Sequence, residues 1–237
     1  MIGGPALDAV RANIVACTAC PRLRRYCQRI ATEKKPAHRD DIYWGRPVPG
    51  FGDPDARLLI VGLAPAAHGA NRTGRVFTGD GSGDFLMSAL ERTGFANIAT
   101  SRHTADGLAL SDAYILAAVR CAPPDNKPTP AEIGRCRRHL SAEIAVLPRL
   151  RVVVALGKIG FDAMLAYWSA RGLPLRPKPA FGHGCEVLLP TDAIAGTAAV
   201  LLGSYHPSRQ NTNTGKLTPP MLESVFGRAR AVIDSRP

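Results

Sequence analysis

A glycine-rich loop with an aromatic ring, two arginines and a carboxylate is the part of this sequence best suited to chemistry. The stretch "GLAPAAHGANRTGRVFTGDGSGDFL", residues 62–86, follows the apolar run "RLLIV". It has no Lys-Ser/Thr pair closing a Walker A loop and no Gly-x-Gly-x-x-Gly directly after the strand, so it fits standard nucleotide sites poorly. Phe77 can stack on a flipped base, Asp80 can bind polar groups, and Arg72 and Arg75 can hold phosphates.

The cysteines suggest a metal centre. Cys17 and Cys20 form a Cys-x2-Cys pair near the N-terminus, Cys121 follows an apolar run, and Cys136 lies in a helical pattern. Structural disulfides are rare in reducing compartments, so four thiolates from two distant regions could hold a 4Fe-4S cluster or a structural zinc ion. A chance pair with scattered buried thiols is the alternative. Two further cysteines have no assigned role: Cys27, which could compete with Cys20 as a ligand, and Cys185.

Apolar runs that alternate with helical patterns must position these residues. The alternation predicts an α/β fold with a mostly parallel sheet covered on both faces. Ligands of such sheets bind beyond the carboxyl ends of the strands, where the three unusual polar loops of this chain can converge. Thr129, Pro130 and Glu132 give one helix a clear start signal. The expected strands are residues 58–63, 113–119, 152–156 and 199–205, with a weaker one at 187–189; the expected helices are residues 8–16, 84–93, 130–147 and 157–170.

The composition favours a polyanionic partner. Lys and Arg total 30 against 19 acidic residues, a formal charge of +11, which attracts nucleic acid over a long range. No apolar run approaches the roughly 18 residues of a membrane span. Asp8 and Arg11 argue against a secretory signal, so we expect a cytoplasmic protein. The length suits a single domain, residues 1–237, in which residues 1–50 form a basic extension.

Several motifs in order resemble those of family 5 uracil-DNA glycosylases, the iron-sulfur, broad-specificity branch of the uracil-DNA glycosylase superfamily. They are "CTACPRLRRYC", "YWGRPVPGFGDP", "GLAPAAHGANRTGRVFTGD", "RCAPPDNKPT" and "YHPSRQNTNTGKLT". The resemblance covers the chain from about residue 17 to residue 218. It implies a three-layer α/β/α sandwich around a central four-stranded, mostly parallel sheet. It also implies a 4Fe-4S cluster on Cys17, Cys20, Cys121 and Cys136, which ties the extension to the core.

The same resemblance implies roles at the site. His206 would donate to the departing base, Asp80 would orient water or stabilise the cationic sugar, and Asn126 would assist at the sugar or water. A loop histidine, a helix cap and a turn residue are the structural alternatives for these three. Leu63 and Ala64 stand where the wider superfamily carries a water-activating residue. The implied base contacts are Gly62, Leu63, Ala64, Ala66 and Phe77, and the implied DNA contacts are Arg72, Arg75, Ser208, Arg209, Gln210 and Asn211.

These implications define an expected activity. We expect a monofunctional glycosylase of base-excision repair that removes uracil, hypoxanthine, ethenocytosine and hydroxymethyluracil from DNA. The small Ala66 fits a wide base pocket, and the three loops contain no evident lysine nucleophile. The expected partner is damaged DNA, with no membrane, no obligate protein partner and a monomeric state. Two alternatives are a non-catalytic iron-sulfur module that binds nucleic acid and a phosphate-ester hydrolase that uses the Gly/Asp loop with a divalent metal.

Overall fold

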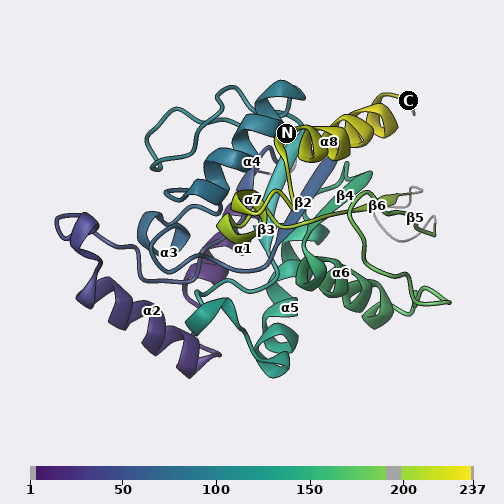
Figure 1. Ribbon diagram of the computed structural model, residues 1–237. Coiled ribbons are helices and arrows are strands. Elements are labelled where there is room, and N and C mark those ends of the chain that lie inside the picture. Colours follow the sequence, from purple (N-terminus) through teal and green to yellow (C-terminus); the bar gives the residue numbers. More distant parts are fainter. Residues whose placement is uncertain (1–3, 191–198, 236–237) are drawn as a thin grey trace.

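One mixed sheet between two layers of helices forms the molecule in the computed structural model, which describes residues 4–190 and 199–235 (Figure 1). The strands lie in the order β1-β3-β2-β4-β6-β5. β3, β2, β4 and β6 run parallel, whereas β1 and β5 pair antiparallel at the two edges. The bounds are β1 Phe51–Gly52, β2 Leu58–Gly62, β3 Ala113–Ala117, β4 Val152–Leu156, β5 Glu186–Leu188 and β6 Val200–Ser204. The predicted α/β fold class is confirmed.

The sheet has six strands among the described residues, so the expected number of four is wrong. The two additional strands are the antiparallel edges. β1 contains two residues, which is too few to produce an alternating pattern in the sequence. β5 begins and ends one residue before the weaker predicted strand at residues 187–189. The four strands that were predicted from clear apolar runs form the parallel centre of the sheet. Three of these strands are shorter than their predicted ranges.

Alternate side chains of β2 enter two separate cores. Leu58 and Ile60 belong to the core under α4 and α8, whereas Leu59 and Val61 belong to the core under α1, α5 and α6. Successive side chains of a strand point to opposite faces, so a strand covered on both sides is apolar throughout. Figure 1 shows α4 and α8 on one side of the sheet and α5 and α6 on the other. The bounds are α1 Gly4–Val15, α4 Gly81–Arg92, α5 Pro130–Ala145, α6 Lys158–Ala170 and α8 Pro219–Asp234.

The predicted start of α5 is confirmed in detail. The Thr129 hydroxyl accepts a hydrogen bond from the Glu132 backbone N–H at 3.2 Å, and the Glu132 carboxylate accepts one from the Thr129 N–H at 2.8 Å. α8 and α2, Pro21–Glu33, are long helices for which no expectation was made. No helix in the described part of the chain is long and apolar enough to span a membrane. Short segments complete the fold: α3 Ala70–Thr73, α7 Arg209–Asn213, η1 Pro36–His38 and η2 Pro124–Asn126.

Candidate functional site

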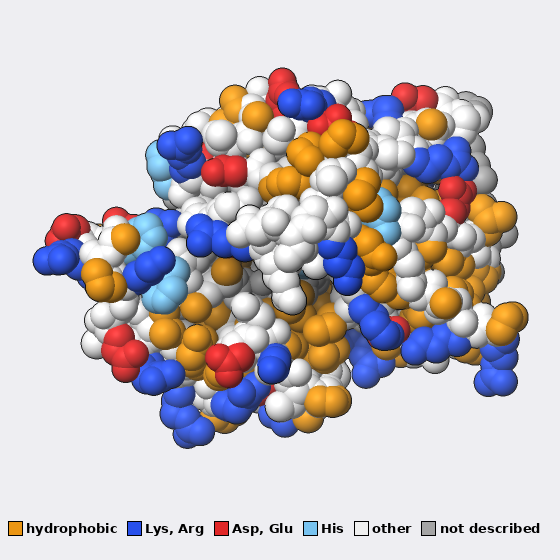
Figure 2. Space-filling model, in the orientation of Figure 1, with side chains coloured by type: hydrophobic (Ala, Val, Ile, Leu, Met, Phe, Trp, Pro, Cys, Tyr) orange, Lys and Arg blue, Asp and Glu red, His pale blue; other side chains and the backbone are white. Residues whose placement is uncertain are grey.

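The polar loops that leave β2, β3 and β6 meet around one hollow of about 360 Å³. Asp80 and Ala66 come from the first loop, Asn126 from the second and Arg209 from the third. This is the convergence expected at the carboxyl edge of a parallel sheet. Figure 2 shows a face that is hollowed near its centre, with Lys and Arg side chains spread around the rim. The other lining residues are Tyr26, Lys35, His38, Ala67, His68, Gly69, Gly79, Pro123 and Asp125.

Asp80 caps α4 at the wall of the hollow. Its Oδ1 accepts hydrogen bonds from the backbone N–H groups of Ser82 and Gly83, both at 3.0 Å. Its Oδ2 lies so close to Gly69 that a Cβ at that position would collide with it. Burial raises the pKa of this carboxyl group, although the backbone donors and Arg209 counteract part of the rise. The helix-capping alternative is therefore present, and it uses only one of the two carboxylate oxygens among the described contacts.

Arg72 holds two backbone segments next to Asp80, one at His68 and one at Gly79. Its Nε donates to the His68 carbonyl at 2.8 Å and its Nη2 to the Gly79 carbonyl at 2.9 Å, while Nη1 contacts Asp41 at 2.8 Å. The Arg72 side chain is 14% exposed. Its donors are engaged within the protein, so this geometry does not favour the expected phosphate contact. Arg72 instead holds Gly79, the residue directly before Asp80.

Arg75 is likewise part of the fold. Its side chain is 6% exposed and forms an ion pair with Asp106 at 2.6 Å. Its Nε donates to the Thr78 hydroxyl at 2.9 Å, and the guanidinium lies over the Phe51 ring. A guanidinium that is buried and paired in this way has little to offer a phosphate. Arg75 is therefore a structural residue of the loop and does not favour the expected DNA contact.

Phe77 and His206 stack on each other at the end of β2. Their ring centroids are 5.7 Å apart with an interplanar angle of 29°. A Cβ on Gly62 would lie 2.7 Å from the Phe77 ring, so the strand must end in glycine to admit it. Phe77 itself has a φ of 49°, a left-handed conformation that is strained for a bulky residue. The two rings adjoin the loops of the hollow but do not line it.

His206 is held as a neutral imidazole. Burial lowers its pKa to about 4, so the ring carries no charge near pH 7. Its backbone carbonyl accepts hydrogen bonds from the Asn211 side chain and the Ser208 N–H, both at 2.8 Å. A neutral imidazole has one N–H donor and one acceptor nitrogen. The ring can therefore donate to a developing anion without first taking up a proton.

Asn126 stands on the opposite loop in an unusual backbone conformation. Asp125 and Asn126 have φ values of 54° and 56°, in the left-handed region that Asn and Asp enter more readily than other non-glycine residues. Both are exposed, and both line the hollow. Asn126 is therefore a turn residue, as the structural alternative from the sequence proposed. The same turn presents the Asn126 side chain beside the hollow that Asp80 lines.

In the loop after β6, two polar side chains form hydrogen bonds within the loop and two are exposed. The Ser208 hydroxyl caps α7 by accepting from the Asn211 N–H at 3.4 Å, and the Asn211 side chain binds the His206 carbonyl. Arg209 and Gln210 are exposed, and Arg209 lines the hollow. Two of the four predicted DNA contacts in this loop are therefore free at the surface, and the other two shape the turn.

Leu63 and Ala64, two of the predicted base contacts, connect the end of β2 with neighbouring segments. The Leu63 carbonyl accepts a hydrogen bond from the Val119 N–H at 3.0 Å, which fixes the loop on the end of β3. Ala64 packs against a small buried cluster that contains Cys27, Cys121 and Cys136. Neither Leu63 nor Ala64 brings a polar side chain. The groups that could act on water are therefore those of Asp80 and Asn126.

The four predicted cysteine ligands converge. Cys17, Cys20, Cys121 and Cys136 line one small hollow between the extension and the start of α5. The Cys136 sulfur accepts a hydrogen bond from the Arg120 N–H at 3.3 Å, as expected for a sulfur prepared to carry charge. Burial raises the pKa of the Cys136 thiol to about 11. No group of three or more Cys, His, Asp or Glu side chains among the described residues is placed to hold a metal ion.

Two buried side chains at this hollow lack partners. Arg120 and His139 line it together with the cysteines. Arg120 forms an ion pair with Glu143, but its Nε and Nη1 have no hydrogen-bond partner, and neither has the Nε2 of His139, among the described residues. Buried donors without acceptors are costly. A thiolate-bound group with inorganic sulfur would supply acceptors for these nitrogens, so the polar lining of the hollow suits an iron-sulfur cluster, although the described thiols are not arranged as ligands of a metal ion.

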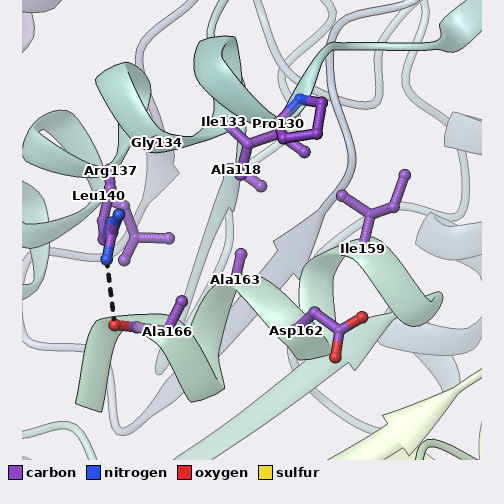
Figure 3. Close-up of a pocket in the computed structure, with 10 residues that line it drawn as sticks. All are labelled: Ala118, Pro130, Ile133, Gly134, Arg137, Leu140, Ile159, Asp162, Ala163 and Ala166. Carbon is purple, nitrogen blue, oxygen red and sulfur yellow. Dashed lines mark hydrogen bonds between the residues drawn. The ribbon is translucent and has the colours of Figure 1, made fainter. Parts of the chain in front are cut away.

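A second cavity of about 320 Å³ lies between α5 and α6 (Figure 3). It is walled largely by aliphatic side chains, including Ile133, Leu140 and Ile159. Its Arg137 donates weakly to the Ala166 carbonyl at 3.4 Å, and its Asp162 is paired with lysines outside the lining. The groups expected to act on a glycosidic bond line the other hollow, which we therefore take as the candidate site.

Sequence reasoning missed part of the wall. His68 lies in the glycine-rich loop itself, and its position between alanines and glycines was a usable signal. Lys35 precedes η1 and His38 ends it, in a polar run that offered only its basic character. Tyr26 is on α2, which was not expected to be a helix. The extension therefore contributes directly to the site.

Comparisons with known proteins show the family of the chain. A sequence model described as the uracil DNA glycosylase superfamily matches residues 49–230. The type-5 uracil-DNA glycosylase of Mycobacterium leprae is 48% identical over 229 residues, which cover 96% of this chain and 96% of that protein. The type-5 uracil-DNA glycosylase of Thermus thermophilus is 46% identical over 223 residues, covering 94% and 96%. That of Pyrobaculum aerophilum is 42% identical over 221 residues, covering 92% and 90%.

Proposed function

The chain belongs to the uracil DNA glycosylase superfamily, and from this premise we propose that it hydrolyses the N-glycosidic bond of uracil in DNA to leave an abasic site. One observation carries the proposal. Asp80, Asn126 and Arg209, from three loops far apart in the sequence, line the same hollow at the carboxyl edge of the sheet. That edge is where open α/β sheets bind substrates.

The chemistry of the bond assigns the neighbouring residues. Cleavage leaves negative charge on the base and positive charge on the sugar. In this proposal the neutral His206 imidazole donates to the base, and Phe77, whose ring stacks on His206, offers its free side to the base. Asp80, through its unengaged oxygen, serves the sugar or the attacking water, with Asn126 as a second polar group. Arg209 and Gln210 are the exposed side chains that contact DNA in this proposal.

The range of bases follows from the size of the pocket wall. Ala66 lines the hollow with a methyl group, and a bulkier side chain there would exclude substituents from the base. We therefore propose that hypoxanthine, ethenocytosine and hydroxymethyluracil are also removed. Lys35 is the one lysine among the described residues that line the hollow, and it comes from the extension and not from the three loops; we propose that the enzyme is monofunctional, without a lyase step.

A panel of duplexes tests the proposal. Each carries one uracil, hypoxanthine, ethenocytosine or hydroxymethyluracil, and excision is measured as alkali-sensitive strand breakage after incubation. Breakage at uracil that persists in EDTA supports the glycosylase and contradicts a metal-dependent phosphate-ester hydrolase. Binding of the duplexes without strand breakage would support the alternative, a non-catalytic module that binds nucleic acid. Borohydride trapping of the protein on DNA would contradict the monofunctional mechanism, because only a Schiff base is trapped.

We propose further that Cys17, Cys20, Cys121 and Cys136 hold a 4Fe-4S cluster. The support is their convergence on one hollow that is also lined by Arg120 and His139, which carry buried nitrogens without hydrogen-bond partners among the described residues. When bound, the cluster supplies a structural link, since it joins the turn before α2 to β3 and α5. The extension reaches the core there by protein contacts as well, because Arg22 forms a bidentate pair with Glu132 at 2.9 and 2.7 Å.

The purified protein is expected to be brown, with the broad visible absorption of an iron-sulfur centre. Cys17→Ala or Cys121→Ala should remove the colour and lower the melting temperature, because each deletes a cluster ligand. Cys185→Ala is the matched control: this cysteine lies beside Gly203, away from the cysteine hollow, and its loss should leave the colour unchanged. A colourless protein that contains stoichiometric zinc after anaerobic purification would contradict the cluster.

Arg72 and Arg209 are expected to respond differently to salt. Arg209→Ala removes an exposed cation at the hollow and should lower the slope of log binding against log salt by about 0.9. Arg72→Ala should change that slope little and instead slow excision by about 10- to 100-fold, because it releases Gly79 beside Asp80. Titrations of an abasic duplex and single-turnover assays measure the two effects. If Arg72→Ala lowered the salt slope of binding and left the excision rate unchanged, the phosphate contact expected from the sequence would be supported.

The setting of the enzyme follows from its substrate. We propose that it acts as a monomer on DNA, without an obligate protein partner, in the cytoplasm. The high positive charge of the chain supports a DNA partner. Sedimentation of the protein alone and on a uracil-containing duplex tests the monomeric state.

A further inference from the structure

The outer part of the hollow is built by residues that the proposed reaction does not use. Lys35, His38 and Tyr26 line it from the extension, and His68 lines it from the loop after β2. The first three precede residue 49, where the match to the superfamily begins. They share the hollow with Asp80 and Asn126, which come from the loops after β2 and β3. The extension therefore adds a wall to the site that the superfamily pattern does not describe.

His68 is held in a fixed orientation at this wall. Its Nδ1 is hydrogen-bonded to the Tyr43 hydroxyl at 2.9 Å, and Tyr43 is only 9% exposed. Its backbone carbonyl accepts from Arg72 Nε at 2.8 Å. Nε2 makes no hydrogen bond within the described part of the chain. When the Tyr43 hydroxyl donates to Nδ1, the proton of a neutral imidazole is on Nε2, which is then a donor.

The charges around His68 are mainly positive. Burial and the neighbouring Lys35, His38 and Arg72 together lower its pKa, and no carboxylate contributes to the shift. Asp41 lies between His38 at 3.3 Å and Arg72 at 2.8 Å, so its charge is already paired. The other charged residues that line the hollow are Asp80, Asp125 and Arg209. Asp80 interacts with Arg209, and Asp125 lies in η2. Neither carboxylate is among the groups that shift the pKa of His68.

We propose that this outer wall binds a phosphodiester of the DNA strand that carries the target nucleotide, with Lys35 supplying charge, His38 beside it, and His68 a directed N–H donor. The inference rests on the proposed function. A nucleotide turned out of the helix brings its flanking phosphates to the mouth of the pocket, where cations and fixed donors position it. The wall thus takes the role that the sequence assigned to Arg72 and Arg75, whose guanidinium groups are engaged elsewhere.

The experiment replaces single phosphates with neutral ones. Duplexes with an abasic analogue receive one methylphosphonate at each linkage around it, and binding is measured for the parent, Lys35→Ala, His68→Ala and Arg39→Ala. Arg39 is the matched control, since it is an exposed cation of the same loop that does not line the hollow. In the parent, one linkage should lose about tenfold in affinity when neutralised, as expected for a hydrogen bond to a charged group.

The variants identify the linkage. Lys35→Ala and His68→Ala should each weaken binding to the unmodified duplex by about tenfold, and neutralising that same linkage should then have at most a twofold further effect. Lys35→Ala should also lower the salt slope by about 0.9. Arg39→Ala should leave the linkage profile of the parent unchanged. His68→Ala should raise the substrate concentration needed for half-maximal rate and leave the saturated single-turnover rate within about threefold.

Two outcomes overturn the inference. One is that every linkage keeps its full effect in Lys35→Ala and His68→Ala; the other is that Arg39→Ala changes the profile as much as Lys35→Ala does. Lys35 is exposed, so its variant does not depend on refolding of the core. The uracil assay is run in parallel. Excision of uracil by the parent with no linkage effect would reject the phosphate wall alone, whereas an absence of excision would reject the proposed glycosylase.

Discussion

Replacement of His206 by alanine is expected to slow single-turnover excision of uracil by about 100- to 1000-fold, the typical value of one preorganised donor aimed at a developing charge. The donor matters because the departing base carries the negative charge of the transition state. Binding of abasic DNA should persist, since that ligand has no base for the imidazole to contact. Rapid-quench assays with enzyme in excess measure the rate, and titration of an abasic duplex measures the binding.

A second histidine provides the control for His206. His183 lies beside Tyr205, the residue before His206, with ring centroids 5.2 Å apart, but it does not stack on Phe77. His183→Ala should excise uracil within about threefold of the parent. The parent rate should also show no fall between about pH 5.5 and 8, because an imidazole with a lowered pKa stays neutral over this range. Folded His206→Ala with near-parental rates would remove the histidine from the mechanism.

Two substitutions of Asp80 should separate catalysis from helix capping. Asp80→Asn keeps an oxygen that can accept from Ser82 and Gly83 but loses the charge, whereas Asp80→Ala loses both. We expect each to slow excision by about 100-fold, within the range of a positioned carboxylate acting on water or a cation. Only Asp80→Ala should also lose about 1 kcal/mol of stability, the usual contribution of an N-cap. Single-turnover rates and denaturant titrations measure the two effects.

Acid pH offers an independent test of Asp80. Burial raises the pKa of its carboxyl group, so a rate that needs the carboxylate should fall on the acid side at a higher pH than for an ordinary aspartate. Asp80→Asn should abolish this acid limb. Asp84→Asn should keep the acid limb but move it to a somewhat lower pH, because the Asp84 charge contributes to the raised pKa of Asp80 while Asp84 itself accepts from the Ser101 N–H outside the hollow. A slow Asp80→Ala beside a fully active Asp80→Asn would mean that the residue acts only as a cap.

The sequence predicted the centre of the molecule well because its signals there are local. Four apolar runs became the parallel strands, and the cap at Thr129 specified the first turn of α5. The rule that loops of a parallel sheet meet at its carboxyl edge then brought together Asp80, Asn126 and Arg209 without any knowledge of contacts. Patterns repeated within one element, and the edge common to all parallel strands, can be read from one sequence.

The environment of a side chain could not be read in the same way. Arg72 and Arg75 are two cations in one glycine-rich loop, and nothing near them in the sequence shows that they are buried. Their partners Asp41 and Asp106 are each 31 positions away, in opposite directions along the chain. Only the tertiary fold brings these carboxylates to the loop. The prediction of phosphate contacts therefore relied on residue type, which does not distinguish a surface arginine from a paired one.

The two unpredicted long helices differ in how much signal they carried. α8 buries Leu222, Val225, Phe226 and Ala229, a helical spacing that was visible in the sequence and overlooked. α2 buries only Leu23 and Cys27 in a strongly basic segment, so its apolar stripe is narrow. Such a stripe becomes decisive only when the surface that covers it is known. That surface is formed by residues after β3, including Val119 and Cys121, and by Cys136 of α5.

The pairing of α2 with a late part of the chain has a consequence for synthesis on the ribosome. Arg22 and its partner Glu132 are 110 positions apart. At roughly 5–20 residues per second, the nascent chain carries α2 for about 5 to 20 s before Glu132 has been added. During that interval Leu23 and the cysteines of the extension have no folded surface to cover them. Delivery of iron and sulfur to all four thiols must therefore follow the emergence of α5, which makes loading of the proposed cluster a late event in the life of each new molecule.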